Sequence, residues 1–403
     1  MTSIIGIILL LAIAFALSSN RSAINWRTVG GAFAIQAGVG AFILYFEPGI
    51  QMLLSLSEFV KSIIEYSDEG IEFLFGAVGN KSLGFIFAFN VLPVIIFFSA
   101  LITVLYHIGI MSWVIRIIGG ALQKLLKTSR PESMSAAANI FVGQTEAPLV
   151  VRPFIPKMTR SELFAIMVGG LASIAGSVMA GYAGLGVEIK YLLAASFMAA
   201  PGGLLMAKLM QPEVDKVHNE LEEVKEEKTD YANVFDAAAS GASSGLQLAL
   251  NVGAMLLAFV ALIALLNGVI GGVGTWFGYP DLTFQMILGV LLQPLAWAIG
   301  VPWEEAQLAG SFIGQKLVVN EFVAYLDFIK YREELSAGTQ AIVTFALCGF
   351  ANFSSIAILM GGIGAMAPSR RKEIAQLGLK AVFAATLANL MSAALAGLFL
   401  SLG

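Results

Sequence analysis

Two short polar stretches interrupt a chain whose other long segments are almost entirely apolar. The first is GQTEAP at residues 143–148, and the second is GQKLVVNE at residues 314–321. Each lies between apolar segments that are too short to cross a bilayer alone. Carboxylate and amide side chains at membrane depth are costly and are usually retained for a function. These two interruptions therefore restrict both the fold and the chemistry of the chain.

Composition identifies the environment of these interruptions as a lipid bilayer. Of the 403 residues, 58% are hydrophobic and 12% are charged, whereas soluble proteins carry roughly a quarter charged residues. Apolar runs of about twenty residues favour helices over a β-barrel. A single cysteine, Cys348, excludes an intrachain disulfide framework, and His107 and His218 are too few for a metal cluster. No motif points to an enzyme, a cofactor or nucleic-acid binding.

Eight membrane-spanning helices are predicted, so the expected fold is an all-α polytopic membrane protein. The segment 47–80 mixes charged and apolar residues, which suits an amphipathic helix at the outer membrane interface. The predicted spans are 3–19, 28–46, 84–108, 161–184, 189–209, 246–271, 338–364 and 375–401.

The distribution of Lys and Arg predicts the orientation of these helices. With the N-terminus outside, most of the basic residues in the loops lie in the cytoplasm, as the positive-inside rule requires. Both termini are then expected on the periplasmic side of a bacterial inner membrane. No basic residue precedes the apolar stretch at 4–17, which therefore predicts a first span rather than a cleavable signal.

The order of segments suggests an internal repeat. An interfacial segment, a Gly-Gln interruption and two spans occur twice, and the first of the two spans carries Ser-Ile-Ala at 173–175 and again at 355–357. An odd number of crossings separates the copies, so they must be inverted, which is a secondary-transporter architecture. The predicted parts are a mainly scaffold region at 1–110, a first repeat with a cytoplasmic-side re-entrant hairpin at 111–209, a cytoplasmic linker and long scaffold helix at 210–281, and a second repeat with an outer-side hairpin at 282–403.

The tips of the two hairpins are expected to carry the chemistry, since unpaired backbone at membrane depth must face protein or a water-filled cavity. Gly143 and Gly314 are expected to make the turns, and Pro148 to begin the returning arm. The alternative is two ordinary kinked spans. No arginine cluster suitable for a phosphate converges at the tips. The polar groups therefore favour a neutral ligand rich in hydroxyl and amide groups, whose ring could stack on Phe350.

Three motifs resemble those of the concentrative nucleoside transporters, in particular the bacterial sodium-coupled members. They are GQTEAPLVVRP at 143–153, NEFVAY at 320–325 and GFANFSS at 349–355, and the resemblance covers essentially the whole chain in order and spacing. It implies a homotrimer whose protomers each carry a scaffold part and a transport part containing both hairpins. The implied substrates are nucleosides of the uridine, cytidine and adenosine class.

The resemblance also implies roles for individual residues. Residues facing the nucleobase would be Gln144, Thr145 and Glu146, with Val178 and Phe350 as apolar contacts. The ribose would be held by Glu321, Asn352 and Ser355. Sodium would be held by the side chains of Asn139 and Ser173 and by the carbonyl groups of Val142 and Ile174. All of these are oxygen ligands, as a hard cation requires, and no other cofactor is implied.

Three alternatives remain open from the sequence. A proton could drive transport instead of sodium, with Glu146 or Glu321 titrating. The same two carboxylates could serve as the acid and base of an intramembrane enzyme, although this leaves the repeat unexplained. A channel is the third alternative, but the polar groups gather at one depth rather than along a pore.

Overall fold

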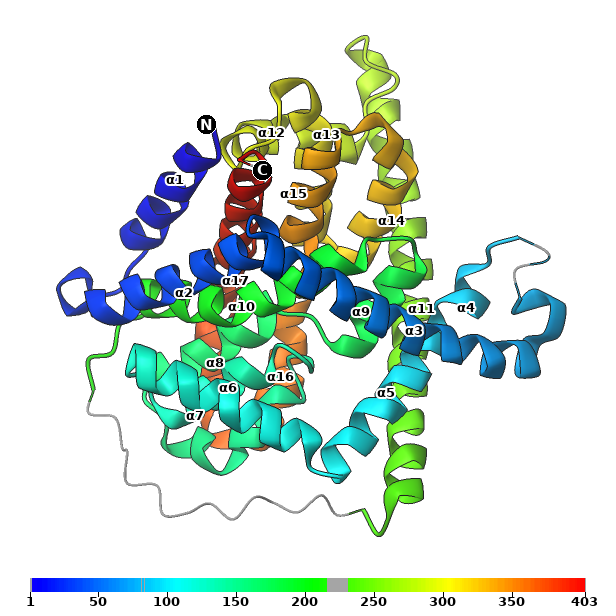
Figure 1. Ribbon diagram of the computed structural model, residues 1–403. Coiled ribbons are helices and arrows are strands. Elements are labelled where there is room, and N and C mark those ends of the chain that lie inside the picture. The colour runs from blue at the N-terminus through cyan, green and yellow to red at the C-terminus, as the bar shows by residue number, and fades with distance from the viewer. Residues whose placement is uncertain (1, 81, 83, 216–230, 403) are drawn as a thin grey trace.

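The computed structural model describes residues 2–80, 82, 84–215 and 231–402, and the described residues form helices with no strand among them (Figure 1). This confirms the predicted all-α class. Most of the predicted linker, at 216–230, lies outside the described residues.

The N-terminal part contains the predicted amphipathic helix. This is α3 (Glu47–Phe75), which is exposed along most of its length. Its neighbours in the chain are α1 (Thr2–Ala16), η1 (Arg21–Ala23), α2 (Trp26–Leu44), η2 (Gly76–Val78), α4 (Phe87–Asn90) and α5 (Leu92–His107).

The same order of elements follows twice: one helix, two hairpin arms, a span broken in its middle and an unbroken span. The first copy is α6 (Ile110–Leu126), α7 (Arg130–Ala138), η3 (Ala147–Lys157), α8 (Arg160–Ala172), α9 (Gly176–Gly184) and α10 (Ile189–Met210). The second is α12 (Phe284–Ala298), α13 (Trp303–Val318), α14 (Glu321–Tyr331) with η4 (Arg332–Glu334), α15 (Ala337–Leu347), α16 (Ser355–Met366), and η5 (Pro368–Arg370) with α17 (Arg371–Leu400). The arms α7 and α13 lie toward opposite ends of the molecule (Figure 1).

Local sequence explains where the two arms of the first hairpin and the following helix α8 begin. Ser129 and Glu132 form a reciprocal capping box at the start of α7, and Thr159 and Glu162 form another at the start of α8. Each box satisfies backbone N–H groups that the first helical turn leaves free. Pro148 lies in the first turn of the returning arm, as expected, although this arm is a 3₁₀-helix rather than an α-helix.

The helix α11 (Val234–Trp276) extends well beyond the predicted span at 246–271. Its 43 residues make a helix of roughly 65 Å, about twice the hydrocarbon thickness of a bilayer. Two glycines four residues apart pack it against α5: a Cβ on Gly241 would lie 2.6 Å from Thr103 Oγ1, and a Cβ on Gly245 would lie 2.7 Å from Ser99 Cβ. Small residues at this spacing allow close helix packing in membranes.

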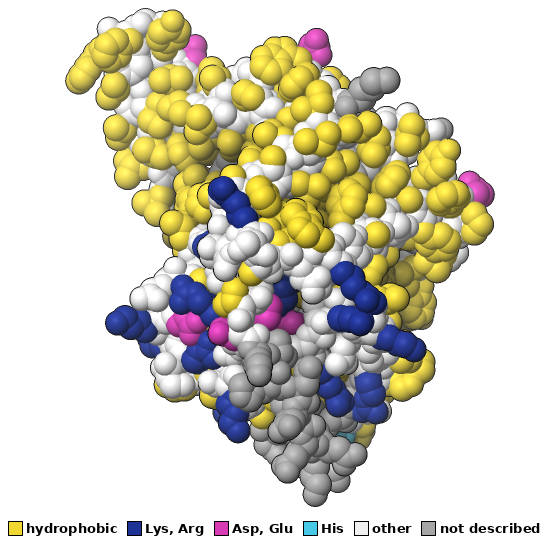
Figure 2. Space-filling model, turned by 90° about the vertical axis from the view of Figure 1, so that its left-hand side faces the viewer, with side chains coloured by type: hydrophobic (Ala, Val, Ile, Leu, Met, Phe, Trp, Pro, Cys, Tyr) yellow, Lys and Arg dark blue, Asp and Glu magenta, His cyan; other side chains and the backbone are white. Residues whose placement is uncertain are grey.

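Two predicted spans are each divided into two helices. The segment 161–184 breaks between α8 and α9, and the segment 338–364 breaks between α15 and α16. In the part of the chain that the structure describes, six helical segments are long and apolar enough to cross a membrane, while α1, α15 and α16 are shorter apolar helices. Figure 2 shows Lys and Arg side chains gathered toward the end where Figure 1 places α7, and hydrophobic side chains covering the opposite part of that face.

Candidate substrate and cation site

The turn of the second hairpin lies later in the chain than the sequence predicts. Gly314 is inside α13, and the chain leaves the helix only at Val319 and Asn320. A Cβ on Gly314 would come within 2.8 Å of Leu288 Cβ on α12. This glycine therefore serves close packing of two helices and not a turn. The turn is completed by Asn320, whose side chain accepts a hydrogen bond from the Val323 N–H and caps α14.

Glu321 begins α14 and is held by two donors from other elements. Its side chain is buried, with 5% relative exposure. The Tyr182 hydroxyl on α9 donates to Glu321 Oε1 at 2.9 Å, and Asn352 Nδ2 donates to Oε2 at 3.1 Å. Hydrogen bonds to a charged acceptor are stronger than those between neutral groups. Glu321 therefore joins the second hairpin to both broken spans.

Asn352 lies in the break between α15 and α16 and has a fixed orientation. Its Oδ1 accepts from the Ser355 N–H at 2.9 Å and from Ser354 Oγ at 2.7 Å. Only its Nδ2 group is then left to point to the carboxylate of Glu321. The structure thus brings together the three residues predicted to bind the sugar, since Asn352, Ser355 and Glu321 are all buried around this break.

Tyr182 is a site residue that the sequence analysis missed. Its ring centroid lies 4.6 Å from those of both Phe322 and Tyr325, and its hydroxyl reaches Glu321. The sequence could have predicted this role, because Tyr182 follows the predicted contact Val178 by four residues and so lies on the same face of α9. Val178 is buried, and Phe350, the other predicted apolar contact, is half-buried.

The tip of the first hairpin packs on α8 through two glycines. A Cβ on Gly169 would lie 3.1 Å from Asn139 Nδ2, and a Cβ on Gly170 would lie 2.9 Å from Gln144 Cβ. Both amides are buried, yet among the described residues Asn139 Oδ1, Asn139 Nδ2 and Gln144 Oε1 have no hydrogen-bond partner. Unpaired buried polar atoms are uncommon and costly. Their presence at the tip indicates a place for a polar ligand.

The predicted sodium ligands surround the break between α8 and α9. The Gly176 N–H donates to the Phe141 carbonyl at 2.9 Å, which holds the segment beside Val142 against residues 173–175. Asn139 and Ser173 are each 1% exposed. The break also follows the C-terminus of α8, where helix carbonyl groups carry partial negative charge. This set of amide, hydroxyl and carbonyl oxygens fits a hard cation.

Thr145 and Glu146 complete the tip, and Thr145 faces a pocket that Glu321 does not line. Glu146 is exposed, and a Cβ on Gly143 would lie only 2.6 Å from its Oε2, so this glycine makes room for the carboxylate. A pocket of about 600 Å³ lies between the first hairpin and α16. Of the predicted substrate contacts, Thr145 lines it. The full lining is Thr145, Leu149, Arg152, Ile358, Gly361, Gly362, Ala365 and Met366.

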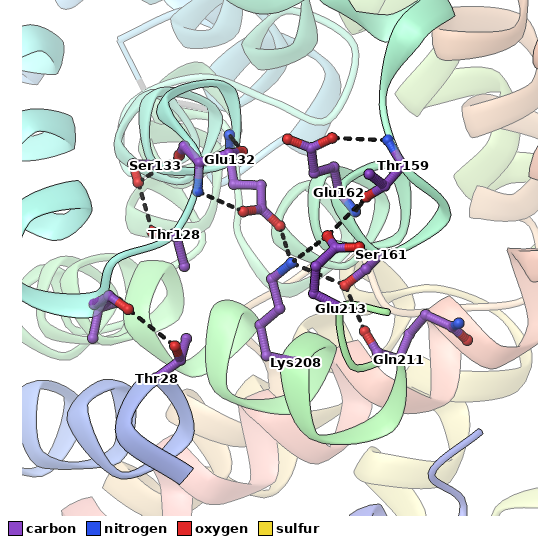
Figure 3. Close-up of polar contacts among 12 residues, drawn as sticks. Thr28, Thr128, Glu132, Ser133, Thr159, Ser161, Glu162, Lys208, Gln211 and Glu213 are labelled. Atoms are coloured by element: carbon purple, nitrogen blue, oxygen red, sulfur yellow. Dashed lines mark hydrogen bonds and ion pairs between the residues drawn. The ribbon is translucent and has the colours of Figure 1, made fainter. Parts of the chain in front are cut away.

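The base of the first hairpin is tied to α8 and α10 by a buried polar cluster (Figure 3). Lys208 on α10 pairs with Glu132 on α7, and its Nζ donates to Ser161 Oγ on α8 at 2.9 Å. Thr159 Oγ1 donates to Glu213 Oε2 at 2.8 Å, and Glu213 lies 3.7 Å from Lys208 Nζ. These contacts connect the hairpin to the helices that flank it.

Comparisons with known proteins agree with the motifs. Three family models cover most of the chain: "Na+ dependent nucleoside transporter N-terminus" at residues 5–78, "Nucleoside recognition" at 88–188, and "Na+ dependent nucleoside transporter C-terminus" at 191–397.

Similar proteins are permeases and transporters rather than enzymes. An uncharacterized transporter of Haemophilus influenzae is 62% identical, covering 100% of this chain and 98% of its own length. Nucleoside permease NupC of Helicobacter pylori is 51% identical, covering 99% and 98%. A solved structure of CNTnw "in an inward-facing substrate-bound state" is 58% identical, covers 100% of this chain and 98% of its own, and superposes with a TM-score of 0.96.

Proposed function

Because this chain belongs to the family of Na⁺-dependent nucleoside transporters, we propose that it is a symporter that imports nucleosides across the bacterial inner membrane, driven by sodium. The observation that carries this proposal is the buried carboxylate of Glu321, oriented by Tyr182 and Asn352 at the meeting of the two repeats. A carboxylate held in this way is an acceptor prepared for the hydroxyl groups of a sugar.

The ribose is assigned to Glu321, Asn352 and Ser355. Each carboxylate oxygen of Glu321 already accepts one hydrogen bond and retains the capacity to accept more. A site built to bond sugar hydroxyls discriminates against analogues that lack them, since its own buried groups are then left unpaired.

The nucleobase is assigned to the tip of the first hairpin. Gln144 Oε1, which has no partner among the described residues, would accept from a base N–H group, and Thr145 and Glu146 add further polar contacts. Val178 and Phe350 would provide the apolar walls. This set suits nucleosides of the uridine, cytidine and adenosine class. The pocket beside Thr145 supports a route between the tip and the side of the membrane from which the first hairpin enters.

Sodium is the proposed coupling ion, at Asn139, Val142, Ser173 and Ile174. These groups supply oxygens and none of them titrates, which favours sodium over the alternative of a proton on Glu146 or Glu321. One positive charge moving inward across 100 mV releases about 2.3 kcal/mol, and a tenfold sodium gradient adds about 1.4 kcal/mol. One ion per substrate could then sustain a nucleoside gradient of roughly several hundredfold.

The assembly and the motion are part of the same proposal. Eight spans and two re-entrant hairpins form an inverted repeat, with both termini periplasmic, and the hairpin-containing transport part alternates between the two sides. A homotrimer is proposed from the family resemblance, and exposed apolar side chains along α11, such as Leu257 and Leu265, support contact with neighbouring protomers or lipid.

Uptake into proteoliposomes tests the function. Labelled uridine should accumulate when an inward sodium gradient is imposed and should saturate with substrate, whereas a proton gradient alone should have no effect. Uptake that persists without sodium and collapses with the proton gradient would establish the alternative. In the variant Glu321→Ala, calorimetry should detect almost no nucleoside binding, and near-normal affinity would reject the ribose assignment.

A further inference from the structure

The buried ammonium group of Lys316 lies where the two broken spans meet. Lys316 is on α13 and is 2% exposed. Its Nζ donates to the Ala346 carbonyl at 2.8 Å and to Asn389 Oδ1 at 2.7 Å. Ala346 is in the last turn of α15, and Asn389 is in the middle of α17.

Asn389 extends this contact to the other broken span. Its Nδ2 donates to the Ala172 carbonyl at the end of α8, at 2.7 Å, and to the Cys348 carbonyl just after α15, at 2.9 Å. The two breaks also touch directly, because the Phe350 N–H donates to the Ser173 carbonyl at 3.2 Å. The C-termini of α8 and α15 therefore converge at one point.

This convergence makes the point electronegative. The last carbonyl groups of a helix lack intrahelical partners and carry the negative end of the helix dipole. Two such ends brought together repel each other unless a positive charge lies between them. The ammonium group of Lys316 supplies that charge, directly to Ala346 at the end of α15 and through Asn389 to Ala172 at the end of α8.

The partners of Lys316 are those of a bound cation rather than those of an ion pair. Lys208, the other lysine buried in the described structure, pairs with Glu132. For Lys316, the described part of the chain provides no carboxylate within 4.0 Å, and its ammonium group donates to one carbonyl oxygen and one amide oxygen. Neutral oxygens of this kind are the ligands that sodium takes at broken helices. Glu321 is the charge partner of Lys316 at longer range. A buried charge with no carboxylate in direct contact is costly and is usually retained for a function.

We propose that Lys316 is a built-in cation that takes the place of a second coupling ion. The inference rests on the proposed function. The mobile sodium ion would sit on the Asn139 side of the crossing, and the fixed ammonium would neutralise the other side, so that one sodium ion accompanies each nucleoside. Asn389 bonds Ala172, which immediately precedes the sodium ligand Ser173, so the ammonium also links the sugar-binding half to the ion-binding half.

The test replaces Lys316 by methionine, which keeps the length of the side chain and removes the charge. Lys380→Met is a closely matched control, because Lys380 Nζ also donates to one helix-terminal carbonyl, that of Met210, and to one amide oxygen, that of Gln211. Labelled sodium and labelled uridine are counted in the same proteoliposomes. For Lys316→Met the ratio should double, from about one sodium ion per uridine to about two, with a steeper dependence of uptake on sodium. For Lys380→Met the ratio should stay at that of the wild type.

Stability provides the second measurement. If sodium fills the place that the ammonium leaves, sodium should raise the melting temperature of Lys316→Met more than that of the wild type or Lys380→Met, and choline should not, because a ligand that binds only the folded state stabilises it. An unchanged flux ratio overturns the inference, and so does a Lys316→Met protein that cannot be purified folded even in high sodium. A wild-type protein that takes two sodium ions per uridine also overturns it. If the wild type shows no sodium dependence, the proposed function itself has failed.

Discussion

The two hairpins differ in whether the buried polar side chains at their tips have hydrogen-bond partners. In the second hairpin, Glu321 receives two hydrogen bonds and Asn320 caps its helix. In the first, the amides of Asn139 and Gln144 are buried with polar atoms that have no partner among the described residues. The polar groups of the second hairpin are thus paired within the protein, whereas those of the first are left for the proposed ligands.

The same contrast extends to positive charge. The ammonium of Lys316 on the second hairpin lies permanently against Ala346 and Asn389, whereas the oxygens beside Asn139 suit a cation that comes and goes. In the proposed function, the half of the site around Glu321 is therefore pre-organised, which lowers the entropy lost on binding, and the half around Asn139 would respond to sodium. Four substitutions test this division.

The largest effect on uridine affinity is expected for Glu321→Gln, which changes the pre-organised half of the site. Glutamine has almost the same shape, but it offers one acceptor and one donor where Tyr182 and Asn352 both donate. One buried donor is left unpaired, and the charged acceptor for the sugar is lost. We expect uridine to bind about a thousandfold more weakly by calorimetry, or ~4 kcal/mol.

The matched control for this variant is Asp327→Asn on the same helix. Asp327 accepts a hydrogen bond from Gln315 Nε2 at 2.8 Å and lies outside the proposed site, so its uridine affinity should be that of the wild type. Equal losses in the two variants would mean that the second hairpin is not specifically prepared for the sugar.

Asn139→Ala tests the half of the site at the tip of the first hairpin, where the buried amides have no partner among the described residues. The sodium concentration for half-maximal uptake should rise about ten- to a hundredfold, or roughly 1.4–2.8 kcal/mol, while uridine affinity at saturating sodium stays near that of the wild type. Since the side chain of Asn139 has no hydrogen-bond partner among the described residues, the melting temperature without sodium should not fall. Asn267→Ala is the control, because Asn267 bonds Gln285 and the Phe284 N–H between α11 and α12, and a similar sodium shift there would reject the cation site.

Tyr182→Phe removes one donor from Glu321 and keeps the aromatic packing. Uridine affinity should fall about five- to tenfold, or ~1–1.4 kcal/mol. The control is Tyr325→Phe, since the hydroxyl of Tyr325 donates to the Thr344 carbonyl at 2.8 Å instead of to Glu321. If both phenylalanine variants lose the same affinity, the loss of any buried hydroxyl group in this aromatic cluster, rather than the hydrogen bond to Glu321, accounts for the effect.

The smallest effect is expected where α16 touches the first tip. A Cβ on Gly362 would lie 3.0 Å from Thr145 Cγ2, whereas a Cβ on Gly361 would meet nothing within 4 Å. Gly362→Ala should therefore raise the KM for uridine about two- to threefold, less than ~1 kcal/mol, and Gly361→Ala should leave it unchanged. Equal KM values for the two variants would show that this contact does not position the tip.

The sequence predicted which polar residues lie together better than it predicted the local geometry around them. It grouped Asn352 with Glu321, and the two are hydrogen-bonded, but it assigned a turn to Gly314, which lies within a helix and packs on Leu288. A glycine is used both for turns and for close helix packing, and its sequence context does not distinguish the two. The breaks in two spans were missed for a related reason, since the apolar pattern continues through them.

By itself, the sequence determined that the chain is an all-helical membrane protein of this family and which polar residues it carries at membrane depth. These properties depend on local composition, because the cost of leaving water applies to each residue wherever it packs. Only the tertiary structure decided which polar groups are paired. Tyr182 and Glu321 are 139 positions apart, and Lys316 and Asn389 are 73 apart. The crossing of the two broken spans brings such residues together, and that crossing depends on how the helices pack.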